Sequence, residues 1–125
     1  MGIIKYYDCI DFEIFIFDNY VINQIKEGID IQPEHNNALN LIIEENFNGK
    51  SLVYISNRVN SYSVNPLIYP KMKDIPNLLA IAIVLKNDAM KKNAEFERRF
   101  FNKPYEIFNS LTQAIIWAEK MLEEK

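Results

Sequence analysis

Short runs of β-branched and aromatic residues fill the first part of the chain, and polar residues separate them. The runs occupy residues 3–7, 12–17 and Tyr20–Ile25. Runs of this length and composition are typical of β-strands. Asp18 and Asn19 stand between the last two runs and tolerate the positive φ values of a tight hairpin turn. The pattern therefore predicts an antiparallel meander at the start of the chain.

The middle of the chain alternates helical and strand patterns. After Pro33, apolar residues recur at three- and four-residue spacing, which predicts a helix of about 14 residues. The apolar runs 52–55 and Leu78–Leu85 show no polar alternation, as expected of strands covered on both faces. Between them, Asn65-Pro66 indicates the start of a short helix. We expect the two runs to be adjacent, parallel, interior strands.

The C-terminal part predicts a helix, a strand and a second helix. The first helix runs from Asn87 or Asp88 to about Phe101, and the strand is Tyr105–Phe108. Ser110 then begins the Ser-x-x-Gln pattern of a capping box. The apolar stripe of the last helix predicts that Trp117 is largely buried. The stripe otherwise consists of Leu111, Ala114, Ile115, Ala118, Met121 and Leu122.

These elements predict one α/β domain over residues 1–125. We expect a mixed β-sheet with N-terminal antiparallel strands, a parallel centre and about four helices. The net charge is −3, which gives nucleic acid no electrostatic reason to bind. Cys9 is the single cysteine, and the N-terminus lacks the features of a secretory signal. We therefore expect a soluble cytoplasmic protein, with peripheral membrane contact as an open alternative.

Candidates for catalysis are few. Cys9 and His35 would have to form any cysteine–histidine nucleophile pair. A lone cysteine at a strand end is more often a small buried hydrophobe, however, and His35 falls in the first turn of a helix. The HExxH, DxDxDG and CxxC metal motifs and the phosphate-binding glycine loops do not occur in the sequence. We expect no metal and no cofactor, and enzymatic activity ranks last among the functions considered.

A polar segment after the strand at 52–55 is the strongest candidate site, because ligands bind beyond the carboxyl ends of strands in α/β sheets. Arg58 is its expected anion contact, and Ser61 and Ser63 are candidate phosphoacceptors before a helix start. The full candidate set is Tyr54, Asn57, Arg58, Asn60, Ser61, Tyr62 and Ser63. The alternative is that these polar side chains only satisfy the loop backbone. For a binding site, we expect Arg58→Ala to weaken binding and leave the fold intact.

A second candidate is the helix predicted to begin at Asn87 or Asp88, which is locally basic. Its Phe96, Phe100 and Phe101 could form a lid over an apolar ligand or a face for anionic lipid. The alternative is a core helix with a charged outer face.

Several segments together resemble the SpoIIAA-like branch of the STAS (sulfate transporter and anti-sigma factor antagonist) superfamily. They are Glu27-Gly28, the VYISNR strand that runs into NSYSVNP, and the terminal FNSLTQAIIWAEKML. The resemblance implies a mixed sheet flanked by helices and a non-enzymatic role. Antagonists carry an Asp-Ser-Ser-Gly or Asp-Thr-Ser-Gly loop, whereas this chain has neither the Asp nor the Gly around Ser61 and Ser63. These serines are therefore candidates by position only.

Two functions follow as expectations. The first is a regulatory or protein-interaction module with an unidentified protein partner. The second is a module that binds a small apolar or acidic ligand, or a lipid, and that contacts the membrane peripherally. The resemblance implies this role because some members of that superfamily bind lipids or apolar ligands and associate with membranes. A homodimer is kept as a further form of assembly.

Overall fold

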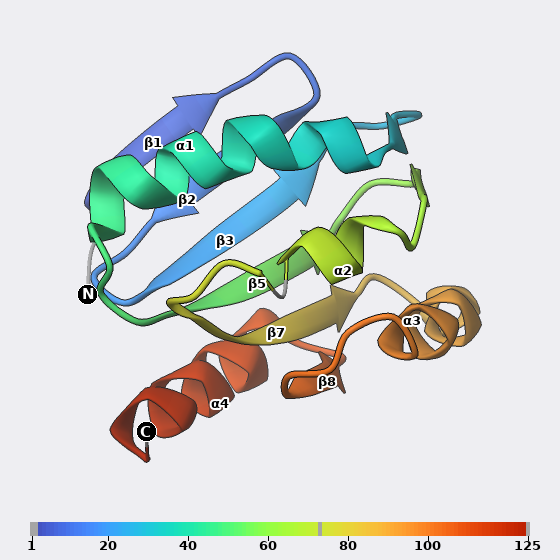
Figure 1. Ribbon diagram of the computed structural model, residues 1–125. Helices are drawn as coiled ribbons and strands as arrows, with labels where there is room; N and C mark the ends of the chain where they lie inside the picture. The colour runs from blue at the N-terminus through green and yellow to red at the C-terminus, as the bar shows by residue number, and fades with distance from the viewer. Residues whose placement is uncertain (1–2, 73, 125) are drawn as a thin grey trace.

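The computed structural model describes residues 3–72 and 74–124, and it places six strands in one mixed sheet (Figure 1). The strand order is β1-β2-β3-β5-β7-β8. Their bounds are β1 Lys5–Asp8, β2 Phe12–Ile16, β3 Tyr20–Ile25, β5 Leu52–Arg58, β7 Leu78–Leu85 and β8 Tyr105–Phe108. Outside this sheet, the two-residue strands β4 Asp30–Ile31 and β6 Ser63–Val64 pair in parallel.

Within the described residues, four α-helices flank the sheet. Their bounds are α1 Asn36–Phe47, α2 Ile68–Met72, α3 Lys91–Arg98 and α4 Leu111–Glu123. Single turns of 3₁₀-helix, Pro33–His35 and Asp88–Met90, precede α1 and α3. The helix α1 lies over one face of the sheet, and α4 lies over the opposite face (Figure 1). The molecule is therefore built in three layers.

The predicted fold class is confirmed. β1, β2 and β3 form the antiparallel meander, and β3, β5, β7 and β8 run parallel. β7 pairs with β5 on one side and with β8 on the other, so the adjacent, parallel, interior placement of β5 and β7 is also confirmed. At the start of α4, the Ser110 hydroxyl accepts a hydrogen bond from the Gln113 amide at 3.2 Å.

Side chains alternate between the two faces along each strand. On β7, Ile81 and Ile83 point toward α1 and α2, whereas Ala80 and Ala82 point toward α4. The α1 face is therefore filled by large aliphatic side chains. On the α4 face, small side chains meet at the centre of the helix contact, where Ala114 and Ala118 of α4 lie in one cluster with these alanines, and larger residues such as Tyr20 and Ile55 complete it.

Several predicted details are wrong. β5 does not end at Ile55 but continues through Arg58, because its pairing with β7 extends to Arg58 opposite Leu85. The prediction for Trp117 is not among them, because this residue keeps only part of its surface exposed at the flank of α4 beside Phe108, with ring centroids 5.6 Å apart. α3 ends at Arg98, before the predicted Phe101, and a turn follows.

Candidate functional site

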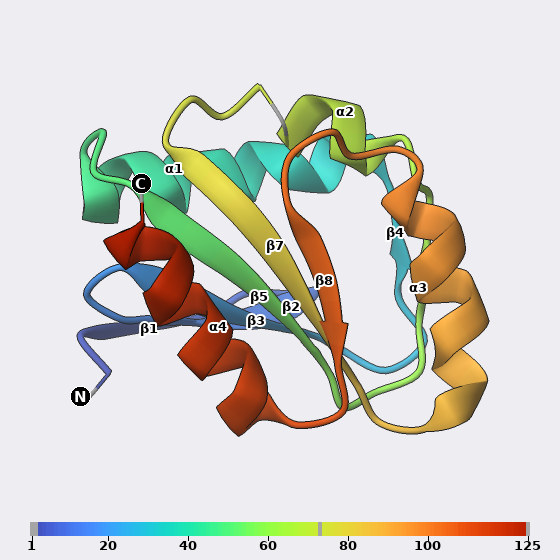
Figure 2. The same ribbon diagram turned by 90° about the horizontal axis from the view of Figure 1, so that it is seen from below.

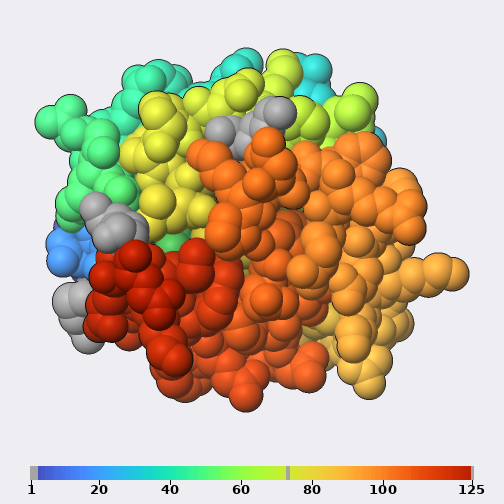
Figure 3. All heavy atoms as spheres, turned by 60° about the horizontal axis from the view of Figure 1, so that its bottom comes forward, coloured from blue at the N-terminus to red at the C-terminus, as the bar shows by residue number. Residues whose placement is uncertain are grey.

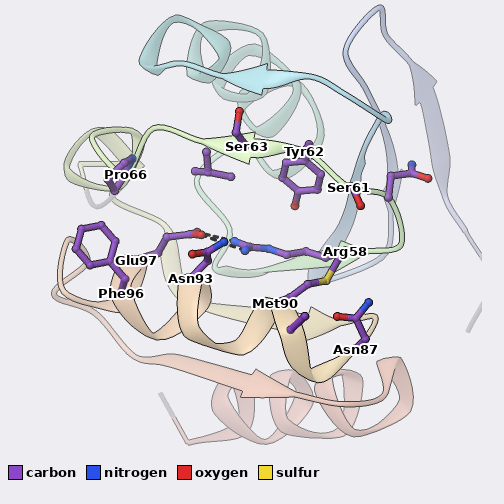
Figure 4. Close-up of a pocket in the computed structure, with 13 residues that line it drawn as sticks. Arg58, Ser61, Tyr62, Ser63, Pro66, Asn87, Met90, Asn93, Phe96 and Glu97 are labelled. Carbon is purple, nitrogen blue, oxygen red and sulfur yellow. Dashed lines mark hydrogen bonds and ion pairs between the residues drawn. The ribbon is translucent and has the colours of Figure 1, made fainter.

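A cavity of about 540 Å³ lies at the carboxyl ends of β5 and β7 (Figure 4). It is bounded by α3 and by residues 60–66, which contain β6 and which we call the β6 segment. We call the cavity the α3 pocket. Arg58 ends β5 and forms part of its wall, and Asn87 follows the end of β7. The lining residues are Arg58, Asn60, Ser61, Tyr62, Ser63, Val64, Pro66, Asn87, Ala89, Met90, Asn93, Phe96 and Glu97. Strand register and the start of α3 thus bring together segments about 30 residues apart in the sequence.

A buried ion pair crosses the pocket wall. The Arg58 guanidinium donates two hydrogen bonds to the Glu97 carboxylate, from Nη2 to Oε1 at 2.5 Å and from Nη1 to Oε2 at 3.1 Å. Both residues are about 95% buried, with exposed fractions of 6% and 5%. A bidentate pair of this kind is geometrically specific and holds α3 against the end of β5. The charge of Arg58 is therefore already compensated within the protein.

Tyrosines surround this pair. The Tyr69 hydroxyl donates to Glu97 Oε1 at 2.5 Å, and the Tyr62 ring lies 5.8 Å from the Arg58 guanidinium carbon. Burial acts to lower the pKa of Arg58, but Tyr62 and the hydrogen bond to Glu97 outweigh it and raise that pKa above its ordinary value. Burial also raises the pKa of Tyr69 well above its ordinary value. The guanidinium is thus always charged and the Tyr69 phenol stays protonated near neutral pH.

One donor of Arg58 is unsatisfied. Its Nε is buried and has no hydrogen-bond partner among the described residues. A small inner cavity of about 30 Å³ lies behind Tyr62 and is also lined by Arg58, Ser56 and Tyr69. That volume suits one water molecule rather than a ligand. Of these two cavities, the α3 pocket is the one large enough for a ligand.

The candidate serines lie at the rim, on the β6 segment. Ser61 and Ser63 are exposed, and Figure 4 shows the Ser63 hydroxyl turned away from Arg58. That hydroxyl donates to Asp30 Oδ1 at 2.8 Å, and the Ser61 amide donates to Glu27 Oε1 at 3.0 Å. Each serine therefore has a carboxylate as its neighbour, and a phosphate on either would meet repulsion.

The other predicted loop residues divide between core and rim. Tyr54 is buried, and its hydroxyl accepts from Asn23 Nδ2 at 2.5 Å, away from the pocket lining. Asn57 donates to Gln24 Oε1 at 2.8 Å, on the face of β5 opposite Arg58. Asn60 lines the pocket and donates to the Ile25 carbonyl at 3.0 Å. The structure therefore brings Arg58, Asn60, Ser61, Tyr62 and Ser63 to one site and leaves out Tyr54 and Asn57.

The three phenylalanines near α3 differ in exposure. Phe101 is buried in the core, Phe100 is half-buried, and Phe96 is 50% exposed at the pocket wall. A lid formed by all three is therefore not what the structure contains, since Phe101 packs inward against Tyr69 and Tyr105.

Cys9 and His35 meet in a different hollow of about 550 Å³ at the turn between β1 and β2, which is more open to solvent. His35 Nε2 lies 2.9 Å from Asp11 Oδ2, and Nδ1 accepts from the Gln32 amide at 2.9 Å. Cys9 is partly rather than fully buried, and burial raises the pKa of its thiol. Both ring nitrogens of His35 are thus engaged, and the thiol is not activated.

Sequence reasoning missed Glu97, Asn87, Met90 and Asn93 as site residues. Glu97 counted only as one acidic residue within a basic helix. The residues next to Glu97 in the sequence do not indicate that it is buried, because the arginine that pairs with it, Arg58, lies 39 residues away. The Asn87 that follows an apolar strand was the one available clue, since polar residues at strand ends line such sites.

Comparison with protein families, curated proteins and solved structures gives no match for this chain. Within residues 3–72 and 74–124, no group of three or more His, Cys, Asp or Glu side chains is arranged to hold a metal ion. None of the helices in the described part of the chain combines the length and apolarity that crossing a bilayer requires.

Proposed function

We propose that this protein is a non-enzymatic regulatory module that binds a small ligand in the α3 pocket. The observation that carries the proposal is where the pocket lies and which groups form its wall. It opens at the carboxyl ends of two central parallel strands, and a buried ion pair with an unsatisfied Arg58 Nε forms part of its wall. Ligands of α/β sheets bind at this edge, in mostly preformed cavities of about 300–1,000 Å³.

A binding role fits the pocket better than catalysis does. Arg58 and Glu97 are the charged side chains of its lining, and each neutralises the other. An acid or base would need a proton to exchange with a substrate, but the Arg58 guanidinium keeps its proton and Glu97 is fully engaged. The lining therefore supplies recognition groups.

The resemblance to the SpoIIAA-like branch of the STAS superfamily is part of this proposal. The antiparallel strands at the start, the parallel centre and the four helices agree with the architecture that the resemblance implies. A regulatory role in the cytoplasm follows as the proposed biological setting. In that setting, ligand binding between β6 and α3 would alter the surface that a protein partner contacts.

A second candidate, peripheral contact with an anionic membrane, rests on the outer side of α3. Lys91, Lys92 and Arg99 are exposed there beside the half-exposed ring of Phe96. Cations next to an apolar ring favour anionic lipid interfaces. Sedimentation with vesicles of anionic phospholipid would test it, and equal sedimentation of the parent and Lys91→Glu/Lys92→Glu proteins would reject it.

A pocket-filling variant tests the main proposal. Asn93→Trp places a large ring in the α3 pocket from an exposed position on α3. Asn37→Trp makes the same change at an exposed position of α1 that does not line the pocket. We expect native mass spectrometry after incubation with a cell extract to detect bound small molecules on the parent and Asn37→Trp, but not on Asn93→Trp. Equal occupancy of both variants would place the site elsewhere.

A further inference from the structure

The charges around the α3 pocket restrict what it can bind. Its lining contains one guanidinium and one carboxylate, joined by two hydrogen bonds, so its net charge is zero. A charged ligand in such a site loses solvation without gaining a free counter-charge. Recruiting Arg58 for an anion would leave Glu97 buried beside that anion. The pocket therefore disfavours both signs of ligand charge.

Charges at the rim do not change this balance. On the β6 side, Glu27 and Asp30 are bound to the Ser61 amide and the Ser63 hydroxyl. On the α3 side, Lys91 and Lys92 are exposed on the outer surface beside the carboxylates of Asp88 and Glu95, over a separate hollow. The carboxylates of the β6 side are already hydrogen-bonded and the α3 side carries both signs, so neither rim sets the charge of the ligand inside.

The remaining polar groups of the lining are amides and hydroxyls. Asn87 and Asn93 are exposed, and their side chains make no hydrogen bond within the described residues. Figure 4 shows Asn93 extending from α3 toward the ion pair. Each amide offers both donors and an acceptor, so each matches a ligand group that also carries both. The rings of Phe96 and Tyr62 and the Met90 side chain supply the apolar part of the same cavity.

We propose that the ligand is uncharged, with both hydrogen-bond donors and acceptors next to an apolar ring. This inference rests on the proposed function, because it names the ligand class of the same pocket. It replaces the acidic ligand expected from Arg58 in the sequence. The physical reason is that Glu97, on a distant segment, already supplies the negative charge that Arg58 requires.

Three probes of equal size separate the ligand charges: benzamide, benzoate and benzylamine. Each is titrated against isotope-labelled protein while NMR follows the amide signals of Asn87, Asn93 and Phe96. We expect benzamide to bind at least about tenfold more tightly than the other two, a difference of about 1.4 kcal/mol. Stronger binding of benzoate or benzylamine at the same signals would overturn the uncharged ligand but leave the binding module in place.

Changing the pocket charge gives the second arm of the experiment. Asn93→Asp adds an uncompensated carboxylate at an exposed position, so preference should move to benzylamine, and Asn93→Lys should move it to benzoate. The control Asn37→Asp on α1 should keep the benzamide preference. An unchanged order of affinities in both Asn93 variants would contradict the proposal. Absence of any shift at these signals with all three probes would refute the binding module as well.

Discussion

The two faces of the central sheet are packed on different principles. Toward α4, the core is apolar, and alanines meet at the helix contact, with Ala80 and Ala82 of β7 in one cluster with Ala114 and Ala118 of α4. Toward α1, α2 and α3, large aliphatic residues fill the centre, but the core ends in the Arg58–Glu97 pair. In the space-filling view, α4 in red and α3 in orange occupy opposite parts of one surface (Figure 3).

The difference between the two faces shows which part of this fold can hold a binding site. Small residues on both sides allow α4 to pack closely against β7. The other face extends past the ends of the strands to α3, which lies on the side of the molecule away from α4 (Figure 2). Polar groups and cavities gather at that end. One face therefore supplies stability, and the end of the other supplies the candidate site.

The largest expected effect comes from breaking the buried pair. Glu97→Ala leaves the Arg58 charge buried without a partner, which should lower the free energy of unfolding by about 3–5 kcal/mol. Arg58→Ala should cost a similar amount, so the earlier expectation of an intact fold does not hold for a buried arginine. Urea denaturation measures both.

A double variant is the control for the buried pair. Arg58→Met/Glu97→Leu removes both charges, so its loss should be clearly smaller than that of either single alanine variant. A double variant as unstable as the sum of the two singles would show that the pair is not energetically coupled.

Overpacking the α4 face should have the next largest effect. Ala118 is fully buried between α4 and the sheet, and Ala118→Leu adds three carbon atoms at this position. We expect a loss of about 1–3 kcal/mol in the free energy of unfolding. Ala38→Leu at an exposed position of α1 should change it by less than about 0.5 kcal/mol. Equal values for the two variants would contradict tight packing under α4.

Trp117 tests the flank of the same face. Full burial would predict a loss of about 3–5 kcal/mol for Trp117→Ala. Because the residue lies at the flank of α4 beside Phe108 and keeps part of its surface exposed, we expect a smaller loss of about 2 kcal/mol, measured by chemical denaturation. A loss above about 4 kcal/mol would mean that the ring is buried more deeply than its position on α4 indicates.

The smallest expected effect is that of one buried hydroxyl. The Tyr105 hydroxyl donates to the Ala94 carbonyl at 2.9 Å, so Tyr105→Phe should cost about 1 kcal/mol at neutral pH. Burial raises the pKa of Tyr105 above its ordinary value near 10. Its contribution to stability is complete below that value and is lost as the pH rises, because only the unfolded chain then releases the proton.

The alkaline part of this expectation has its own measurement. Denaturation midpoints between pH 8 and pH 11 should fall less steeply for Tyr105→Phe than for the parent protein. Identical slopes would show that the hydroxyl ionises equally well in the folded state.

Local patterns in the sequence sufficed to predict the six strands of the main sheet and the four α-helices in their order, but not the two-residue strands β4 and β6. Leu78–Leu85 was predicted with its observed bounds, because a run of apolar residues between Pro76 and Asn87 allows only a covered strand. Tyr20–Ile25 and Tyr105–Phe108 were also predicted with the bounds that the structure gives. The cap at Ser110 was predicted as well, since a capping box involves residues only three positions apart.

Only the tertiary structure decided the length of β5 and the role of Arg58. Asn57 and Arg58 look like loop residues by composition, but pairing with Val84 and Leu85 of β7 keeps them in the strand. Arg58 looked free to bind an anion, and its partner Glu97 lies 39 residues further along the chain. Local periodicity carries information about neighbours in sequence, whereas charge compensation in a core depends on which distant segments the fold brings together. The sequence therefore predicted the strand and its polar end, but it did not predict that the pocket beside them is electrically neutral.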